Sequence, residues 1–532
     1  MQPLLEDASG NPPPFTSSVP LEHSSNIDIL HSNPRSRWPE WIALSLYAVL
    51  VAFAIPYHEP WADEAQSWQL ARTLSLPELF HTYLRYEGSP GLWHFLLWIM
   101  VRIHLNYAGL HWVCGAIAAV AASVLIFRSP FPRYLRLTLP FTYFLLFQYA
   151  IIARSYALVP LLLFIIAWWW KRSPVLIALL LGLVANVALH AAVLSGGLAI
   201  AYCIAQARDG AFRKPGFRRK LLWSALILLG FYAFAVWTAW PPHDLLNQVS
   251  QARRHPRPFL QWALISLTWG MCEPWVLSIL FWIAIALCLN ARRSLYYLLP
   301  VLLFSIFCGA VDVGFWHAGL LVPLVICTLW ITWPASNGRT AYEMIGRAAM
   351  VLLVGVQILW SAYAIAYDHS HAYSPDLAAA RFLQPLVRNG ATIAVTSVNM
   401  PEVQAYDDVG ILPYFDHNVY VNQPHPFWWW STQNHTQEMF PAALRSHPPV
   451  VLIETRRTTA SEPFDMNHPS VKLAVAAGYR LTNVFCGAKP LRLELSIEVC
   501  HLIFRPVETA PVIPANVHTA DSPTTLASGQ VK

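Results

Sequence analysis

Residues 155–207 contain three apolar stretches in close succession: SYALVPLLLFIIAWWW (155–170), PVLIALLLGLVANVAL (174–189) and AAVLSGGLAIAYCIAQA (191–207). None of them contains Asp, Glu, Lys or Arg. Each approaches the roughly 20 apolar residues that a helix needs to cross the hydrocarbon core of a bilayer. A helix at the surface of a soluble protein would keep a polar face, which these stretches lack. They therefore predict membrane-spanning helices.

The rest of the chain has the same character. Of its 532 residues, 56% are hydrophobic and only 12% are charged, with a mean hydropathy of +0.42. Soluble domains carry about 25% charged residues, so this composition excludes an ordinary cytosolic enzyme. The formal charge of +6 is small for the length, and the basic residues lie mostly in short loops. That pattern is typical of membrane topology and not of nucleic-acid binding.

The predicted fold class is a polytopic α-helical membrane protein of about eleven spans with a small C-terminal α/β domain. The spans are expected at 39–57, 109–127, 135–152, 155–170, 174–189, 191–207, 221–240, 274–290, 295–310, 316–333 and 347–367.

Strict alternation of these spans places every basic connector on one side, which the positive-inside rule assigns to the cytoplasm. We expect a multi-pass protein of the plasma (inner) membrane, with a cytoplasmic N-terminus and an extracytoplasmic C-terminal domain. Residues 58–108 then form an outer loop. Its segment 91–107 is apolar, but a full span there would invert every later loop, so we interpret it as an interfacial or re-entrant helix. The basic connectors contain Arg128, Arg133, Arg136, Lys171, Arg172, Arg208, Arg213, Lys214, Arg218, Arg219, Lys220, Arg292, Arg293, Arg339 and Arg347.

The domain organisation follows from the changes in composition. Residues 1–38 are predicted to be a disordered cytoplasmic tail, 39–372 the transmembrane domain, 373–505 a soluble α/β domain and 506–532 a disordered tail. Within the soluble domain, LAAARFLQPLV is expected to be helical, and TIAVTSV and VVLIE to be buried strands.

The cysteines divide in the same way. Six lie in or beside apolar spans, where they are expected to be packing residues. Cys486 and Cys500 lie in the soluble domain and are able to bridge two strands, provided that the domain faces an oxidising compartment.

Polar chemistry is concentrated in the outer loop, PYHEPWADEAQSWQLARTLSLPELFHTYLRYEGSPGLWHFLLW. The adjacent carboxylates Asp63 and Glu64 are able to act as a general base, to bind a divalent cation, or both. No cofactor is required by the pattern, and a divalent cation held by this pair is the one metal that it suggests. The plain alternative is a solvated loop with ordinary surface charges.

Three motifs resemble the GT-C superfamily of membrane glycosyltransferases, which includes protein O-mannosyltransferases and the aminoarabinose transferases of lipid A. They are the Asp-Glu pair within WADEAQSWQLAR, the aromatic helix start YEGSPGLWHFLLW, and ARSYAL at Ala153–Leu158. The resemblance covers roughly residues 39–240. The second proline of the family's helix start is missing near Ser89 and Pro90, which leaves the register of that helix open.

The resemblance implies an inverting, bacterial enzyme of the cell envelope that takes a sugar from a polyprenyl phosphate at the outer membrane face. Asp63 would be the general base that deprotonates the acceptor hydroxyl, and Glu64 would orient it or help to hold a cation. Arg154 is the first candidate to stabilise the leaving phosphate. Further candidates for substrate binding are Arg72, Arg85, Glu87, Tyr156 and His190.

The expected partners are thus the lipid-linked donor, a lipid, polysaccharide or protein acceptor, and the bilayer itself, with no nucleic acid. The sequence leaves the donor sugar and the acceptor open. A transporter or flippase of lipid-linked glycans is the main alternative, although transporters usually place ionisable residues at mid-membrane depth. No GxxxxGK[ST] phosphate loop is present, which argues against ATP-driven export.

Weaker candidates lie elsewhere on the expected outer side. They are Asp312 and His317 at a turn, a basic patch at Arg253–Arg257, and the Trp428–Trp430 run, which is able to stack on a sugar ring.

Overall fold

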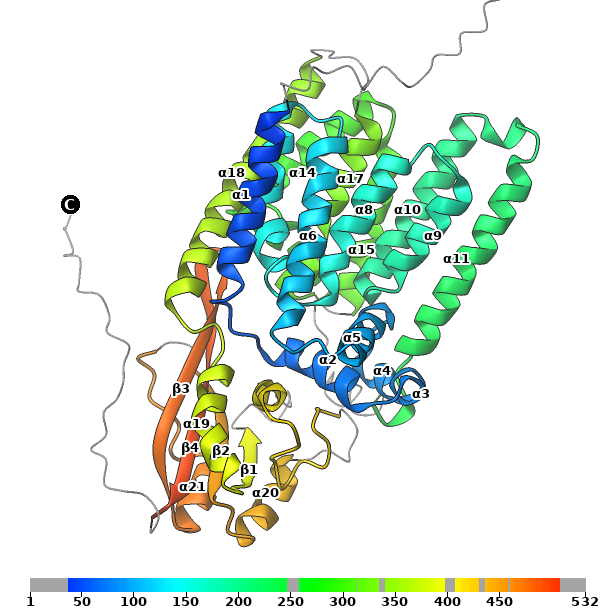
Figure 1. The fold of residues 1–532 in the computed structure, drawn as a ribbon. Coiled ribbons are helices and arrows are strands. Elements are labelled where there is room, and N and C mark those ends of the chain that lie inside the picture. Colours follow the sequence, from blue (N-terminus) through cyan, green and yellow to red (C-terminus); the bar gives the residue numbers. More distant parts are fainter. Residues whose placement is uncertain are drawn as a thin grey trace, which may run out of the picture.

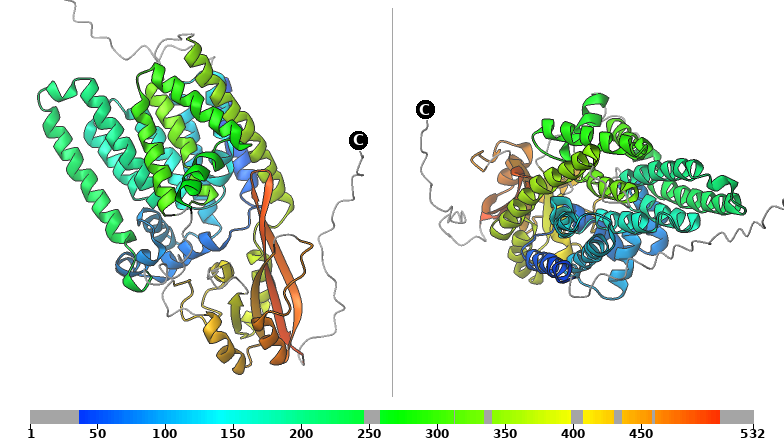
Figure 2. Two further views of the ribbon diagram at one scale, coloured as in Figure 1. Left: turned by 180° about the vertical axis from the view of Figure 1, so that it is seen from behind. Right: turned by 90° about the horizontal axis from the view of Figure 1, so that it is seen from above.

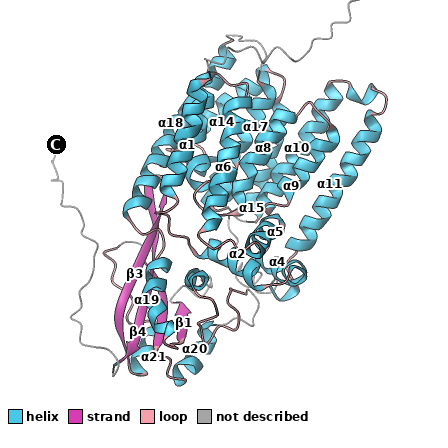
Figure 3. Ribbon diagram, viewed as in Figure 1, coloured by secondary structure: helices cyan, strands magenta, loops and turns pink. Residues whose placement is uncertain are grey.

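Apolar helices and a small sheet occupy separate parts of the molecule (Figure 1 and Figure 3). All strands of the described residues follow residue 392, whereas the chain before it is helical. This confirms a mostly helical protein with a small C-terminal sheet. The computed structural model describes residues 37–245, 258–311, 313–333, 340–397, 407–429, 436–457 and 460–507. The basic patch at 253–257, Asp312, Trp430 and most of both predicted tails lie outside the described residues.

The main helices run roughly side by side in a bundle (Figure 1 and Figure 2). In chain order they are α1 (Trp38–Ala54), α6 (Gly109–Arg128), α8 (Leu158–Trp169), α9 (Pro174–Ala185), α10 (Leu189–Arg208), α11 (Phe217–Ala239), α14 (Trp275–Ala291), α15 (Leu299–Ala310), α17 (Leu321–Thr332) and α18 (Ala341–Ser370).

Five helices of the described chain are long and apolar enough to cross a membrane: α6, α10, α11, α18 and the segment Phe315–Thr332, in which α16 (Phe315–Ala318) leads into α17. Other apolar helices, among them α1, α8, α9, α14 and α15, have 10–17 residues. The α13 helix (Phe259–Trp269) also belongs to this shorter group. The structure therefore supports membrane character, in a coarser form than the eleven predicted spans.

The expected continuous helix at 135–152 is wrong. This stretch is divided into α7 (Arg133–Thr138), the short turn η4 (Leu139–Phe141) and the wide turn η5 (Phe144–Gln148), followed by unwound backbone. Pro140 explains the first break, because proline has no N–H to donate and its ring clashes with the preceding turn. The unwound backbone ends in the short turn η6 (Ser155–Ala157), which leads into α8.

The bundle has two chemically different ends. At one end, Glu40 of α1 accepts hydrogen bonds from Arg133 Nε at 2.9 Å and Arg136 Nη2 at 3.3 Å. Arg208, at the end of α10, donates to the backbone carbonyl of Arg293 near the end of α14. The opposite end, where α1 and α18 finish and α6 starts, carries the outer loop and the C-terminal domain (Figure 1).

The outer loop forms a layer of short helices beneath the bundle (Figure 1). It contains α2 (Ala62–Thr73), α3 (Leu76–Glu78), η3 (Leu79–Tyr83), α4 (Leu84–Glu87) and α5 (Leu92–Arg102). The α5 helix is 11 residues long, which corresponds to about 16 Å and is too short to cross a bilayer. Its first N–H, at Leu92, donates to the carbonyl of Asn186, so the layer is tied to the α9–α10 turn.

The C-terminal sheet has the order β1-β2-β4-β3. β1 (Ile393–Ser397) is parallel to β2 (Val450–Arg457), whereas β4 (Glu494–Pro506) is antiparallel to β2 and to β3 (Tyr479–Leu491). The predicted strands TIAVTSV and VVLIE are thus confirmed as β1 and β2. The remaining elements are α19 (Asp376–Arg388), which confirms the predicted helix, η9 (Asp407–Tyr414), α20 (Thr436–Arg445) and α21 (Pro469–Ala476).

Cys486 and Cys500, whose pairing the sequence left open, face each other on β3 and β4 and form a disulfide. Among the other cysteines, Cys203 is exposed and the remaining five are buried.

Candidate functional site

Asp63 and Arg154 meet where the outer loop covers the bundle. The α2 helix begins after Trp61, whose backbone N–H donates to the Glu64 carboxylate at 3.1 Å, and this cap places Asp63 in the first turn. Arg154 comes from the unwound backbone before η6. Its Nη2 lies 2.7 Å from Asp63 Oδ2, and both side chains keep some exposure, 18% for Arg154 and 10% for Asp63. Aromatic rings surround the guanidinium, those of Trp61, Tyr156 and Trp316.

This ion pair lies in the wall of a cavity of about 530 Å³. Five of the residues predicted for the site line it together: Asp63, Glu87, Arg154, Tyr156 and His190. They come from α2, α4, the turn before α8 and the start of α10, so segments far apart in the chain meet here. The wall also contains Gln66, Ser67, Tyr86, Trp93, His94 and His317.

Glu64 faces away from this cavity, although it follows Asp63 directly. Its side chain is fully buried, and Oε1 lies 2.9 Å from His111 Nε2 of α6. The backbone N–H groups of Trp61 and Ala153 also donate to the carboxylate. Burial alone would raise the pKa of Glu64, but His111 and His58 outweigh it and hold the pKa well below its usual value. Glu64 is therefore an internal anion.

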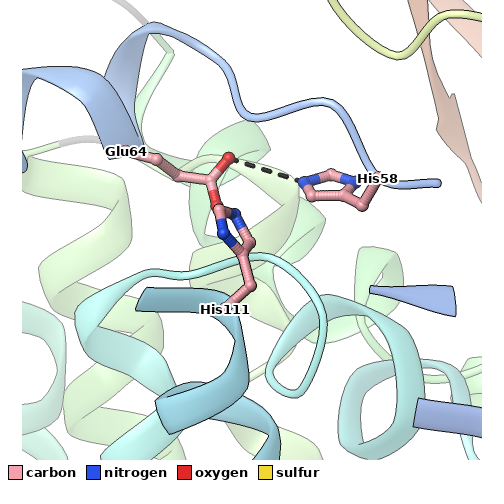
Figure 4. Close-up of side chains that lie close together, drawn as sticks. All are labelled: His58, Glu64 and His111. Carbon is pink, nitrogen blue, oxygen red and sulfur yellow. Dashed lines mark hydrogen bonds and ion pairs between the residues drawn. The ribbon is translucent and has the colours of Figure 1, made fainter. Parts of the chain in front are cut away.

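His58 lies on the other side of Glu64. Its Nε2 is 3.5 Å from Glu64 Oε2, and its Nδ1 is 3.0 Å from Asp368 Oδ2 near the end of α18. Burial favours the neutral ring, but the two carboxylates overcome this effect and raise the pKa of His58 to about 10. The sequence placed His58 among the loop charges without a role. Only the fold brings His58, Glu64 and His111 together (Figure 4).

Glu87 contributes a second carboxylate to the cavity wall. Its Oε1 accepts a hydrogen bond of 2.7 Å from Gln66 Nε2. Burial raises the pKa of Glu87 to about 7; the hydrogen bond from Gln66 opposes this shift and the nearby Asp63 adds to it. Glu87 therefore changes its charge near neutral pH, beside the Asp63–Arg154 pair.

Arg72 and Arg85 do not line the cavity. Arg72 is directed at the C-terminal domain, where Nη2 lies 3.5 Å from the carbonyl of Leu412. Arg85 donates through Nε to the carbonyl of Trp240, at 2.9 Å, just after α11. Arg72 lies about 13 Å from Asp63 along the axis of α2, and Arg85 lies on a different helix, α4.

His94 extends the predicted set, and His317, a weaker candidate from the sequence, lies in the wall with the predicted His190. His94, on α5, is 3% exposed, and neither ring nitrogen has a hydrogen-bond partner within the described residues. The His190 and His317 rings stack with centroids 3.8 Å apart. The apolar, aromatic surroundings of His94 in GLWHFLLW gave no sequence signal, because a lone histidine in such a helix is usually a packed residue.

An apolar groove of about 840 Å³ adjoins the cavity. It runs between the short helices of the outer loop and the pair α9–α11, and is lined by residues such as Phe80, Phe95, Leu183, Phe231 and Trp237. Gly91, Leu92 and Asn186 line the groove, and their chain neighbours Ser89, Trp93 and Ala188 line the cavity. A ligand with a long apolar chain and a polar head would thus be able to place the chain in the groove and the head in the cavity.

Comparison with known proteins adds no relative: no family model, curated protein or solved structure matches this chain.

Proposed function

We propose that the protein is an inverting glycosyltransferase that moves a sugar from a polyprenyl-phosphate donor to an acceptor hydroxyl. The observation that carries the proposal is the Asp63–Arg154 pair, located in a polar cavity that adjoins an apolar groove. A lipid-linked sugar consists of an apolar chain, a phosphate and a polar ring. These three parts correspond to the groove, the guanidinium and the cavity.

The chemistry assigns one step to each member of the pair. Asp63 takes the proton of the acceptor hydroxyl while the acceptor oxygen bonds to the anomeric carbon. The bond from that carbon to the phosphate oxygen breaks, and the lipid phosphate leaves with the bonding electrons. Arg154 stabilises the negative charge that develops on it. Attack from the face opposite the phosphate inverts the anomeric centre.

In the structure Arg154 contacts Asp63, with Nη2 2.7 Å from Oδ2. We infer that the donor phosphate competes for the guanidinium. Binding of the donor would then replace the contact of Arg154 with Asp63, so that Asp63 Oδ2 turns to the acceptor hydroxyl only when a donor is present. This order would limit deprotonation of acceptors in the absence of donor.

The finer topology belongs to the same proposal. The five apolar helices, the basic residues at one end of the bundle and the C-terminal disulfide support a GT-C-like arrangement of about eleven spans. In it, the cavity faces the extracytoplasmic side of the plasma membrane, as does the C-terminal domain. A cavity at one end of the helices favours transfer of a group at the membrane surface over transport through the bilayer centre.

The test is sugar transfer in reconstituted membranes, with a panel of radiolabelled polyprenyl-phosphate sugars and separate recovery of lipid, protein and polymer fractions. Asp63→Asn should reduce transfer by at least about 100-fold, the usual contribution of a general base. Asp209→Asn is the matched control, because Asp209 is an exposed carboxylate at the other end of α10.

Transfer at the wild-type rate by Asp63→Asn would remove Asp63 as the base. Failure of the wild-type protein to consume any donor, combined with movement of labelled lipid between leaflets, would replace the proposal with a flippase.

A further inference from the structure

The geometry points to a zinc-type metal site formed by His58 Nε2, His111 Nε2 and the Glu64 carboxylate. Their ligand atoms all lie within 4.8 Å of one another, in a pocket that the three side chains fill almost without exposure to solvent (Figure 4). The site is separate from the cavity that holds Asp63. It does not depend on the proposed sugar transfer.

The distances suit a small tetrahedral ion. With metal–nitrogen and metal–oxygen bonds of about 2.0–2.2 Å, ligand atoms of a tetrahedral site are about 3.3–3.6 Å apart. The separation between His58 Nε2 and Glu64 Oε2 is 3.5 Å, and that between His111 Nε2 and Glu64 Oε1 is 2.9 Å. The first separation lies in the tetrahedral range. The second is a hydrogen bond and is shorter, so the ion would have to replace this bond while His111 and Glu64 move apart.

The orientation of His58 supplies a second observation. Its side chain is fully buried, and Nε2 points toward Glu64 Oε2 at 3.5 Å, a long ion-pair contact. The opposite nitrogen, Nδ1, is held by Asp368 at 3.0 Å. A carboxylate on one nitrogen of a histidine whose other nitrogen faces the metal is the usual outer-sphere arrangement of protein zinc sites.

The backbone hydrogen bonds to Glu64 leave lone pairs of its carboxylate available for a metal. Trp61 N–H donates to Oε2 and Ala153 N–H donates to Oε1. Each carboxylate oxygen has two lone pairs, so one remains on each oxygen for a metal. Two imidazoles and one carboxylate favour zinc or a similar transition metal over magnesium, which prefers oxygen ligands alone.

The ligands come from three elements that the metal would tie together: the segment after α1, the first turn of α2, and the first turn of α6. Glu64 is adjacent to Asp63, and its bond to Ala153 N–H fixes the residue next to Arg154. A metal here would therefore hold both members of the ion pair in place from behind. Glu64, His58 and His111 are positioning residues in this role.

Elemental analysis of the full chain tests the site without any assay of activity. The protein, carrying an affinity tag free of histidine, is purified in detergent and analysed by mass spectrometry for Mn, Fe, Co, Ni, Cu and Zn. We expect about one zinc per chain. Removal of the metal by a chelator should lower the apparent melting temperature, and added Zn²⁺ should restore it. Co²⁺ should give the visible absorption bands of a tetrahedral site.

Variants locate the metal. His58→Gln and His111→Gln should each lose most of the bound metal, and Asp368→Asn should weaken binding by about 10–100-fold, as expected for an outer-sphere partner. His369→Gln is the matched control, because His369 is exposed and next to Asp368 but outside the cluster; it should keep the full metal content.

Less than about 0.1 equivalents of metal in the wild-type protein, together with no uptake of Zn²⁺ or Co²⁺, would overturn the proposal. So would full metal content in folded His58→Gln and His111→Gln. If a variant fails to fold, the chelator experiment still tests the proposal, because it uses the wild-type chain.

Discussion

Asp63 and Glu64 are neighbours in the chain, but their carboxylates have different surroundings. Successive residues of a helix point about 100° apart, so Asp63 faces the cavity and Arg154 while Glu64 turns inward to His111. A partly exposed carboxylate and a fully buried one are thereby placed side by side on one turn. The contacts of the buried Glu64 hold the turn that carries Asp63.

Arg154 offers a prediction about the leaving phosphate. Arg154→Gln removes the charge and should reduce kcat by about 10–100-fold, equivalent to about 1.5–3 kcal/mol for a lost charge-assisted hydrogen bond. Arg154→Lys keeps the charge and should recover part of the loss. The measurement is single-turnover transfer from a lipid-linked donor. Equal rates for the Gln and Lys variants would show that the charge at this position does not act on the phosphate.

Glu87 gives a prediction about pH. Its pKa is raised in the folded protein from 4.5 to about 7. Its favourable contribution to the free energy of unfolding is therefore complete below pH 4.5 and is lost as the pH rises through 7. Glu87→Gln imitates the protonated group. The variant should have the wild-type melting temperature at pH 5 and a higher one at pH 8. At pH 8 its free energy of unfolding should exceed that of the wild type by roughly 1–3 kcal/mol.

Glu78 is the control with the opposite sign. Hydrogen bonds from Ser75 lower the pKa of this exposed carboxylate, so its stabilising contribution is present at neutral pH and disappears as the pH falls through the lowered pKa. Glu78→Gln should therefore reduce the melting temperature at pH 8. An identical pH dependence for wild type and Glu87→Gln would contradict the assignment to Glu87.

At the scale of elements, the unwound chain after η5 matters more than the regular helices. It lets Arg154 reach Asp63 while the preceding Ala153 N–H donates to Glu64. A continuous helix would have satisfied these backbone groups internally and pointed them along its own axis. The break in the helix that was predicted at 135–152 is therefore part of what assembles the site.

Close contact between α10 and α15 supports the opposite wall of the cavity. A Cβ at Gly197 would collide with the backbone of Pro300. Gly197→Ala should force the two helices apart and lower the melting temperature by several degrees, since backbone cannot move as a side chain does. Gly355→Ala is the matched control, because Gly355 lies in α18 and a Cβ added there would meet open space. Equal stability of both variants would contradict the close packing.

At the scale of the whole molecule, the C-terminal domain closes over α2. Gln66 Nε2 donates to the carbonyl of Trp428 at 2.6 Å, and Trp428 N–H donates to Gln66 Oε1 at 2.8 Å. Gln69 Nε2 donates to the carbonyl of Pro426 at 2.7 Å. The helix that carries Asp63 is thus held from one side by the bundle and from the other by the C-terminal domain.

Gln66→Met tests this docking. The change removes both bonds to Trp428 and the bond to Glu87, and leaves buried backbone groups unpaired at a cost of about 1–3 kcal/mol each. We expect faster hydrogen exchange in 426–429 and in α2, with the sheet unaffected. Ser67→Ala is the control, since the Ser67 hydroxyl donates to the carbonyl of Asp63 in its own helix. Unchanged exchange in Gln66→Met would show that other contacts hold the domain.

Local sequence information is enough to indicate the helical membrane character, the C-terminal α/β region, and Asp63 and Arg154 as separate candidates. It consists of runs of apolar residues, strand patterns, and charges that have no place inside a span. Other features depend on contacts between distant segments, which only the folded chain makes. They are the break at 139–154, the partners of Glu64, and the contacts that direct Arg72 and Arg85 away from the cavity. The spacing of apolar residues indicates which face of a helix or strand is buried. It does not indicate which other element packs against that face.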